Sequence, residues 1–133
     1  MYHRYTDSNS PMSEWGHAMF ASRPEPSYGR NHYIYDGRGA VRIEELEQIV
    51  KDAWLACQES GDWGEMYDDY YQSLSADEAF GSLNPTDIVS SAGGWDCDLM
   101  VWFWQFVAEP NGITAVLTND GAIVFDESLI AAA

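Results

Sequence analysis

Residues 99–125 read LMVWFWQFVAEPNGITAVLTNDGAIVF, and this stretch decides the fold class because an apolar helix is followed directly by a β-hairpin. The helix is predicted over residues 99–107, where apolar residues recur at spacings of three and four. Met100 and Trp104 widen the apolar stripe until it nearly surrounds the helix, which is typical of a central, buried helix. We therefore expect three side chains to be almost completely buried, those of Trp102, Phe103 and Phe106.

The hairpin is predicted from the residues that follow this helix. Pro110-Asn111-Gly112 ends the helix, and residues 113–117 and 122–125 form two short apolar runs. Asn119-Asp120-Gly121 lies between the two runs, and Asp-Gly in that position is among the strongest short sequence signals for a hairpin turn. The sequence thus predicts two antiparallel strands after the central helix.

The residues between 40 and 98 predict further helices. Apolar residues recur at three and four over 42–58, which indicates one buried helix face. Residues 62–74 combine aromatic and acidic side chains, and they predict a second helix with a solvated, negative face. Asn84-Pro85-Thr86-Asp87 has the residue types of a helix start: a capping Asn, a Pro at the first position and an acid in the first turn.

Three short segments rich in β-forming residues precede these helices, over 1–6, 16–22 and 32–35. The order of three strands, a helical middle and a hairpin predicts an α+β fold rather than alternating β-α-β units. The chain has 133 residues, of which 46% are hydrophobic, and we expect it to form a single domain over residues 1–133.

The composition argues against several classes of protein. No apolar run approaches the length of about 18 residues that a membrane-spanning helix needs. Cys57 and Cys97 lie outside any metal-binding spacing, and we expect both to be free thiols in a reducing compartment, the cytoplasm. With three histidines and no metal-binding motif, no metal site is expected. The glycine-rich phosphate-binding motifs are also absent.

The formal net charge is −16, and it is distributed unevenly. Residues 1–51 hold all six basic residues and seven acidic ones, whereas residues 52–133 hold fifteen acidic residues and no Lys or Arg. Such a surface repels nucleic acid and anionic membranes, and it suits a basic or nucleic-acid-binding partner protein. The alternative is that the charge serves only solubility. The candidate partner-binding residues are Asp62, Glu65, Asp68, Asp69, Asp77 and Glu78.

Both ends of the chain resemble the ADP-ribosyltransferase-like superfamily. Tyr2-His3-Arg4-Tyr5-Thr6 resembles its first strand, which usually reads Tyr-His-Gly followed by Thr or Ser. Residues 16–22 with Tyr28-Gly29 resemble its second strand and the tyrosine-bearing helix that follows. Residues 110–126 resemble the terminal strands of small phage and bacterial members, which include anti-CRISPR ADP-ribosyltransferases.

The resemblance implies two small β-sheets around a split with a helical middle, NAD as cofactor, and mono-ADP-ribosylation of a host protein as an anti-defence activity in the host cytoplasm. Asp120 would stabilise the positive charge that develops on the ribose. Tyr28 would stack on nicotinamide, and His3 would form a hydrogen bond with a ribose hydroxyl. The implied cofactor-binding residues are His3, Tyr5, Phe20 and Tyr28.

Two departures from the family pattern motivate a second hypothesis. Arg4 stands where the family has Gly, and no Gln/Glu-x-Glu pair occurs near the C-terminus. A chain that kept the fold without the reaction would be an acidic inhibitor that binds a nucleic-acid-handling host complex by occupancy. Carboxylates on one face of a helix recur about every 5–6 Å, a spacing close to that of phosphates along DNA. A third possibility is a solvated acidic domain with another target.

Overall fold

The computed structural model describes residues 1–12, 18–22, 29–67, 69–83, 98–119 and 121–133. These residues form a mixed α+β structure, as the sequence predicted, with one seven-stranded sheet in the order β4-β5-β6-β2-β1-β3-β7. The strands are β1 (Tyr2–Thr6), β2 (Met19–Ser22), β3 (Asn31–Tyr35), β4 (Val41–Arg42), β5 (Ala115–Leu117), β6 (Gly121–Val124) and β7 (Ala131–Ala132). The α-helices are α1 (Glu47–Ser60), α2 (Asp69–Gln72), α3 (Ala76–Leu83) and α4 (Asp98–Phe103).

The sheet differs from the two small sheets expected from the sequence, because β2 pairs on both sides. It pairs antiparallel with β6 over four residues, including Phe20 with Ile123. On its other side it pairs antiparallel with β1, where His3 lies opposite Ser22. Among the described residues, the His3–Ser22 pair joins β1, β3 and β7 to the rest of the sheet.

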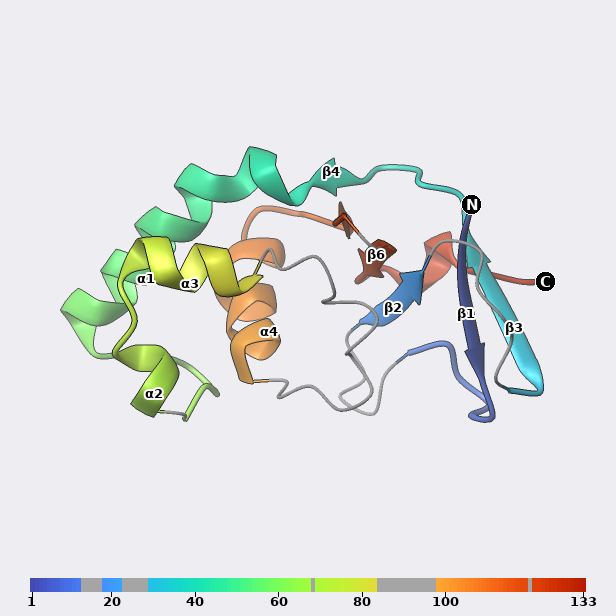
Figure 1. Ribbon diagram of the computed structural model, residues 1–133, viewed down its shortest axis with the longest axis horizontal. Helices are drawn as coiled ribbons and strands as arrows, with labels where there is room; N and C mark the ends of the chain where they lie inside the picture. The colour runs from blue at the N-terminus through green and yellow to red at the C-terminus, as the bar shows by residue number, and fades with distance from the viewer. Residues whose placement is uncertain (13–17, 23–28, 68, 84–97, 120) are drawn as a thin grey trace.

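The helices and the outer strands lie at opposite ends of the molecule (Figure 1). Figure 1 shows α1, α3 and α4 at one end and the paired strands β1 and β3 at the other, with β2 and β6 between them. Residues of β2, β5 and β6 alternate between two hydrophobic clusters, one on each face of the sheet. The larger cluster includes the buried side chains of α1, α3 and α4, so the helices cover only the face to which Phe20 and Ile123 point.

The predicted central helix is present, but it changes from an α-helix to a π-helix after Phe103. Trp102 and Phe103 are buried in α4, with 0% and 1% exposure, and the ring of Trp54 packs edge-on against Trp102 at a centroid distance of 4.8 Å. Residues Trp104–Ala108 then form a π-helix. The wider π turn changes the angular spacing of its side chains, so Phe106 lies off the buried stripe although Val107 is fully buried. The expectation that Phe106 is nearly fully buried was therefore wrong, since its side chain is half-buried.

The helix predicted over 42–58 is confirmed as a 3-10 turn, Ile43–Leu46, that continues into α1. Gly61 ends α1 with a φ of +75°, and its N–H donates to the carbonyl of Cys57. Cys57 is a buried free thiol, as expected. Cys97 and the helix start predicted at 84–87 lie outside the described residues.

The continuous helix predicted over 62–74 was wrong. Of the described residues there, only those of α2 are helical. Residues 62–64 form a turn instead, in which the Asp62 carboxylate accepts from the N–H of Gly64 at 3.0 Å and Gly64 has a φ of +59°. The helix α3 was not predicted from the sequence. Its signal was a capping box, in which the Ser75 hydroxyl accepts from the Glu78 N–H and the Glu78 carboxylate accepts from the Ser75 N–H.

Gly121 in β6 has no room for a side chain against the backbone of β2, and we expect Gly121→Ala to be destabilising. A Cβ there would overlap the carbonyl oxygen of Ala21, a backbone atom that cannot move without disturbing the sheet. The expected loss is about 1–3 kcal/mol of unfolding free energy, measured by urea denaturation. Gly81→Ala is the matched control, since nothing lies within 4 Å of its Cβ position in α3, and it should gain about 0.5–1 kcal/mol. Equal effects of the two substitutions would contradict the expected clash between a side chain at Gly121 and the backbone of Ala21.

Candidate active site

His3, Tyr5 and His32 form a cluster on one face of the β1–β3 pair. Tyr5 lies opposite His32 in this antiparallel pairing, and His3 lies two residues before Tyr5, so all three side chains share that face. The His3 Nδ1 lies 2.8 Å from the His32 Nε2, which is a hydrogen bond between the rings. The Tyr5 ring stacks on the His32 ring with centroids 4.1 Å apart and planes 13° apart.

The His3–His32 hydrogen bond needs at least one neutral ring, because a doubly protonated pair has no acceptor. Burial lowers the pKa of His3, and the neighbouring His32 and the N-terminal amine lower it further. All three causes favour the neutral imidazole of His3. Its Nδ1 is engaged by His32, so Nε2 is the ring nitrogen left for a ligand.

His3, Ser22 and Gly121, the first residue of β6, form one row across the sheet, because each is paired with the next on the neighbouring strand. His3 pairs with Ser22, and Ser22 pairs with Gly121. With strands about 4.8 Å apart, the backbones of His3 and Gly121 are separated by roughly 10 Å. Gly121 directly follows Asp120 in the chain. Asp120 and Tyr28 themselves lie outside the described residues.

The other two strand residues of interest lie apart from this cluster. Phe20 shares the face of His3, but its side chain is only 5% exposed and belongs to the hydrophobic core beneath the helices. Arg4 alternates to the opposite face, where it lies opposite Tyr33. Its Nε is buried and has no hydrogen-bond partner among the described residues. The Arg4 side chain therefore does not crowd the His3 face.

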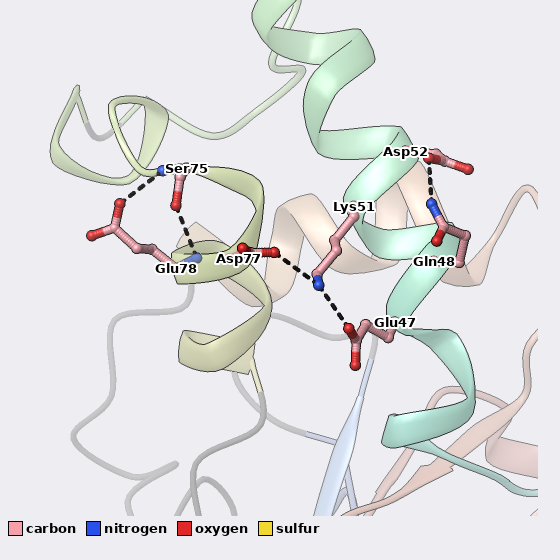
Figure 2. Close-up of polar contacts among 7 residues, drawn as sticks. All are labelled: Glu47, Gln48, Lys51, Asp52, Ser75, Asp77 and Glu78. Atoms are coloured by element: carbon pink, nitrogen blue, oxygen red, sulfur yellow. Dashed lines mark hydrogen bonds and ion pairs between the residues drawn. The ribbon is translucent and has the colours of Figure 1, made fainter.

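Two of the six candidate partner-binding acids, Asp77 and Glu78, hold α3 through bonds with the chain's own residues (Figure 2). Lys51 of α1 lies 2.6 Å from Glu47 and 2.8 Å from Asp77, and so links α1 to α3. Glu78 forms the capping box with Ser75, and hydrogen bonds from Ser75 hold the pKa of the Glu78 carboxyl below its ordinary value. Both acids thus help to form and anchor α3.

The remaining acids do not follow one helix. Asp62 and Glu65 lie in the turns before α2, and Asp69 begins α2. All three are exposed, and none takes part in an ion pair with another described residue. Asp68 lies outside the described residues. The even helical spacing that suggested a copy of backbone phosphates is therefore absent, although the negative charge is exposed.

Two of the surface hollows are lined by described residues, and neither includes His3, Tyr5 or Phe20. The lining of one, of about 290 Å³, includes Trp104 and Phe125, and the lining of the other, of about 360 Å³, includes Cys57 and Phe106. In the part of the chain that the structure describes, no three His, Cys, Asp or Glu side chains gather to hold a metal ion. None of the described helices has the length and apolarity to cross a membrane.

His32 is the residue that sequence reasoning missed. Residues 32–35 were expected to be a strand, and β3 (Asn31–Tyr35) confirms it. The contact with His3 depends on the register of two strands 29 positions apart, and nothing local in the sequence specifies that register. The only hint in the sequence was that His3 and Tyr5 lie two residues apart, so their side chains share one face of a strand.

No protein-family model matches the chain, and neither a curated protein nor a solved structure matches it.

The lowered pKa of His3 predicts a pH dependence of stability. Between the pKa of His3 in the folded state and its ordinary value of 6.5, the unfolded chain binds more protons than the folded one. Stability therefore falls as the pH drops through this window. We expect His3→Gln to remove part of the fall in melting temperature between about pH 7 and pH 5. Identical pH profiles for the wild type and the variant would contradict the prediction.

Proposed function

We propose that the protein is an NAD-dependent mono-ADP-ribosyltransferase with an ADP-ribosyltransferase-like fold, which modifies a host protein as an anti-defence activity in the host cytoplasm. The observation that carries the proposal is the row from His3 through Ser22 to Gly121. The first strand and the last hairpin are far apart in sequence, and the reaction requires His3 and Asp120 to meet in one site. The row supports this meeting because Gly121 adjoins Asp120.

The chemistry assigns one role to each group. The bond between nicotinamide and ribose breaks, nicotinamide leaves with the bonding electrons, and a nucleophile of the target protein bonds to the ribose carbon and gives up its proton. Positive charge develops on the ribose between these events, and the Asp120 carboxylate would stabilise it. The free Nε2 of His3 would bind a ribose hydroxyl, and Tyr28 would hold the nicotinamide ring.

Two further features support the proposal. The Arg4 side chain lies on the opposite face of the sheet, so the residue that replaces the family's Gly leaves the His3 face open. The cluster of His3, Tyr5 and His32 lies on β1 and β3, away from the helices, and every residue of these two strands except Tyr35 is half-buried. Phe20 lies in the core, and we assign it the role of supporting β2 instead of contacting NAD.

The test combines cofactor binding with transfer. NAD is titrated into the purified protein by calorimetry, and NAD labelled on the adenine side is then incubated with the protein and a host lysate. We expect binding, and label on a host protein; NAD labelled in nicotinamide should leave no label on protein. His3→Ala should weaken NAD binding, whereas Tyr33→Phe, on the opposite face, should not. Absence of both binding and transfer in the wild type would refute the proposal.

The second candidate function is an acidic inhibitor that binds a basic, nucleic-acid-handling host protein by occupancy. Tyr67 and Tyr70 favour it, because they are 78% and 68% exposed next to the exposed acids of α2 and its preceding turns. Exposed tyrosines are enriched where proteins bind partners, and their rings attract Lys and Arg. Association with a basic partner should slow sharply with added salt, since salt screens exposed charges. A salt-independent association rate would leave solubility as the role of the charge.

A further inference from the structure

We propose that His32 is a positioning residue that fixes the tautomer and ring orientation of His3, so that the His3 Nε2 is preset for the ribose of NAD. The inference rests on the proposed function, because it concerns a residue that positions His3 in the same site. It adds a residue that the resemblance does not contain. The juxtaposition that carries it is the 2.8 Å contact between the His3 Nδ1 and the His32 Nε2.

His32 is itself held from several directions. Its strand β3 lies between β1 and β7, and its carbonyl accepts from the N–H of Ala133 at 2.9 Å. The Tyr5 ring covers one face of its imidazole. The His3 and His32 rings are also nearly parallel, with planes 21° apart. A ring fixed by backbone pairing, stacking and one hydrogen bond is a firm support for its neighbour.

The chemical consequence concerns the tautomer of His3. A neutral imidazole has one donor and one acceptor nitrogen, and an imidazole in water exchanges the two roles. A hydrogen bond at Nδ1 assigns one role to that atom and the opposite role to Nε2. The groups that face His3 are His32, Tyr5 and the N-terminal amine, and no carboxylate is among its described charged neighbours. The tautomer of His3 is therefore coupled to that of His32, the described group that bonds its Nδ1. Because the His3 Nε2 already has a fixed role and orientation, less free energy is lost in ordering the side chain when the ligand binds.

Two variants test the proposal. His32→Phe keeps an aromatic ring beneath Tyr5 and removes the hydrogen bond, whereas His32→Gln offers an amide as a replacement partner for Nδ1. Tyr33→Phe is the control on the same strand and the opposite face. The readouts are the ¹⁵N chemical shifts of the His3 ring nitrogens without NAD, and the dissociation constant for NAD. Thermal melts establish that each variant is folded.

We expect a single His3 tautomer in the wild type and a mixture in His32→Phe, with NAD binding about 3- to 10-fold weaker. His32→Gln should restore much of both. An unchanged His3 tautomer in His32→Phe, or unchanged NAD affinity in that variant, would overturn the inference while the proposed function stands. If the wild type does not bind NAD, the proposed function fails, and the ring-nitrogen shifts alone then decide whether His32 fixes His3.

Discussion

Phe103→Ala is expected to lower the free energy of unfolding by about 3–5 kcal/mol, the usual cost of deleting a buried aromatic ring. Phe103 is 1% exposed, and its ring stacks on Phe125 with centroids 6.0 Å apart. It thereby joins α4 to the segment that follows β6. Domains of this size are stable by only about 5–15 kcal/mol, so the variant should be marginal and its denaturation midpoint should fall markedly.

Phe106→Ala is the matched control, because it deletes the same ring from the next turn. The π-helix leaves Phe106 half-buried, next to Gly64 and at the edge of a surface hollow. A partly exposed ring removes less apolar surface from water, so its loss should cost clearly less than that of Phe103. Equal losses in urea denaturation would mean that the change of winding in this helix has no energetic consequence.

Asp120→Asn is expected to reduce the rate of NAD cleavage by about 10²–10³, the usual effect of removing one electrostatic contact with a transition state. The affinity for NAD should change little, since the charge acts on the positive ribose that exists only during the reaction. The substitution isolates the charge because Asn-Gly is as favourable in a hairpin turn as Asp-Gly. Single-turnover kinetics and calorimetry separate the two quantities.

Glu127→Gln is the control for this substitution, since it removes an exposed carboxylate beyond the other end of β6. It should leave the rate unchanged. If Asp120→Asn retains the wild-type rate in a protein that binds NAD, another group carries the charge stabilisation. If the protein neither binds nor cleaves NAD, Asp120 is a turn residue only, and the occupancy hypothesis becomes the better account of the acidic surface.

The elements that could be predicted from the sequence are those set by local chemistry. Asp120-Gly121 between two apolar runs predicted the strands that appear as β5 and β6, and the apolar period over 42–58 predicted α1. The failures also had local causes. The spacing of aromatics over 62–74 was mistaken for a helix although Gly64 adopts a positive φ, and the capping box at Ser75 was overlooked.

The rest depends on contacts between distant strands. Nothing local indicates that β2 lies between β6 and β1, or that Tyr5 lies opposite His32, because register is set by the whole sheet. The strands β4 and β7, with two residues each, are too short to show an alternating pattern. The candidate site was therefore predictable in its residue types, such as His3 and Tyr5, but its partner His32 was not.

The two edge strands of the sheet limit how other proteins can bind it. Among the described residues, the sheet ends at β4 on one side and at β7 on the other, and each has only two residues. An exposed edge normally invites another chain to add a strand, and very short edges offer few unpaired N–H and C=O groups for that addition. The exposed Arg42 adds a charge at the β4 edge. We therefore expect any protein that binds this chain to recognise its side chains, and the chain to resist edge-to-edge aggregation.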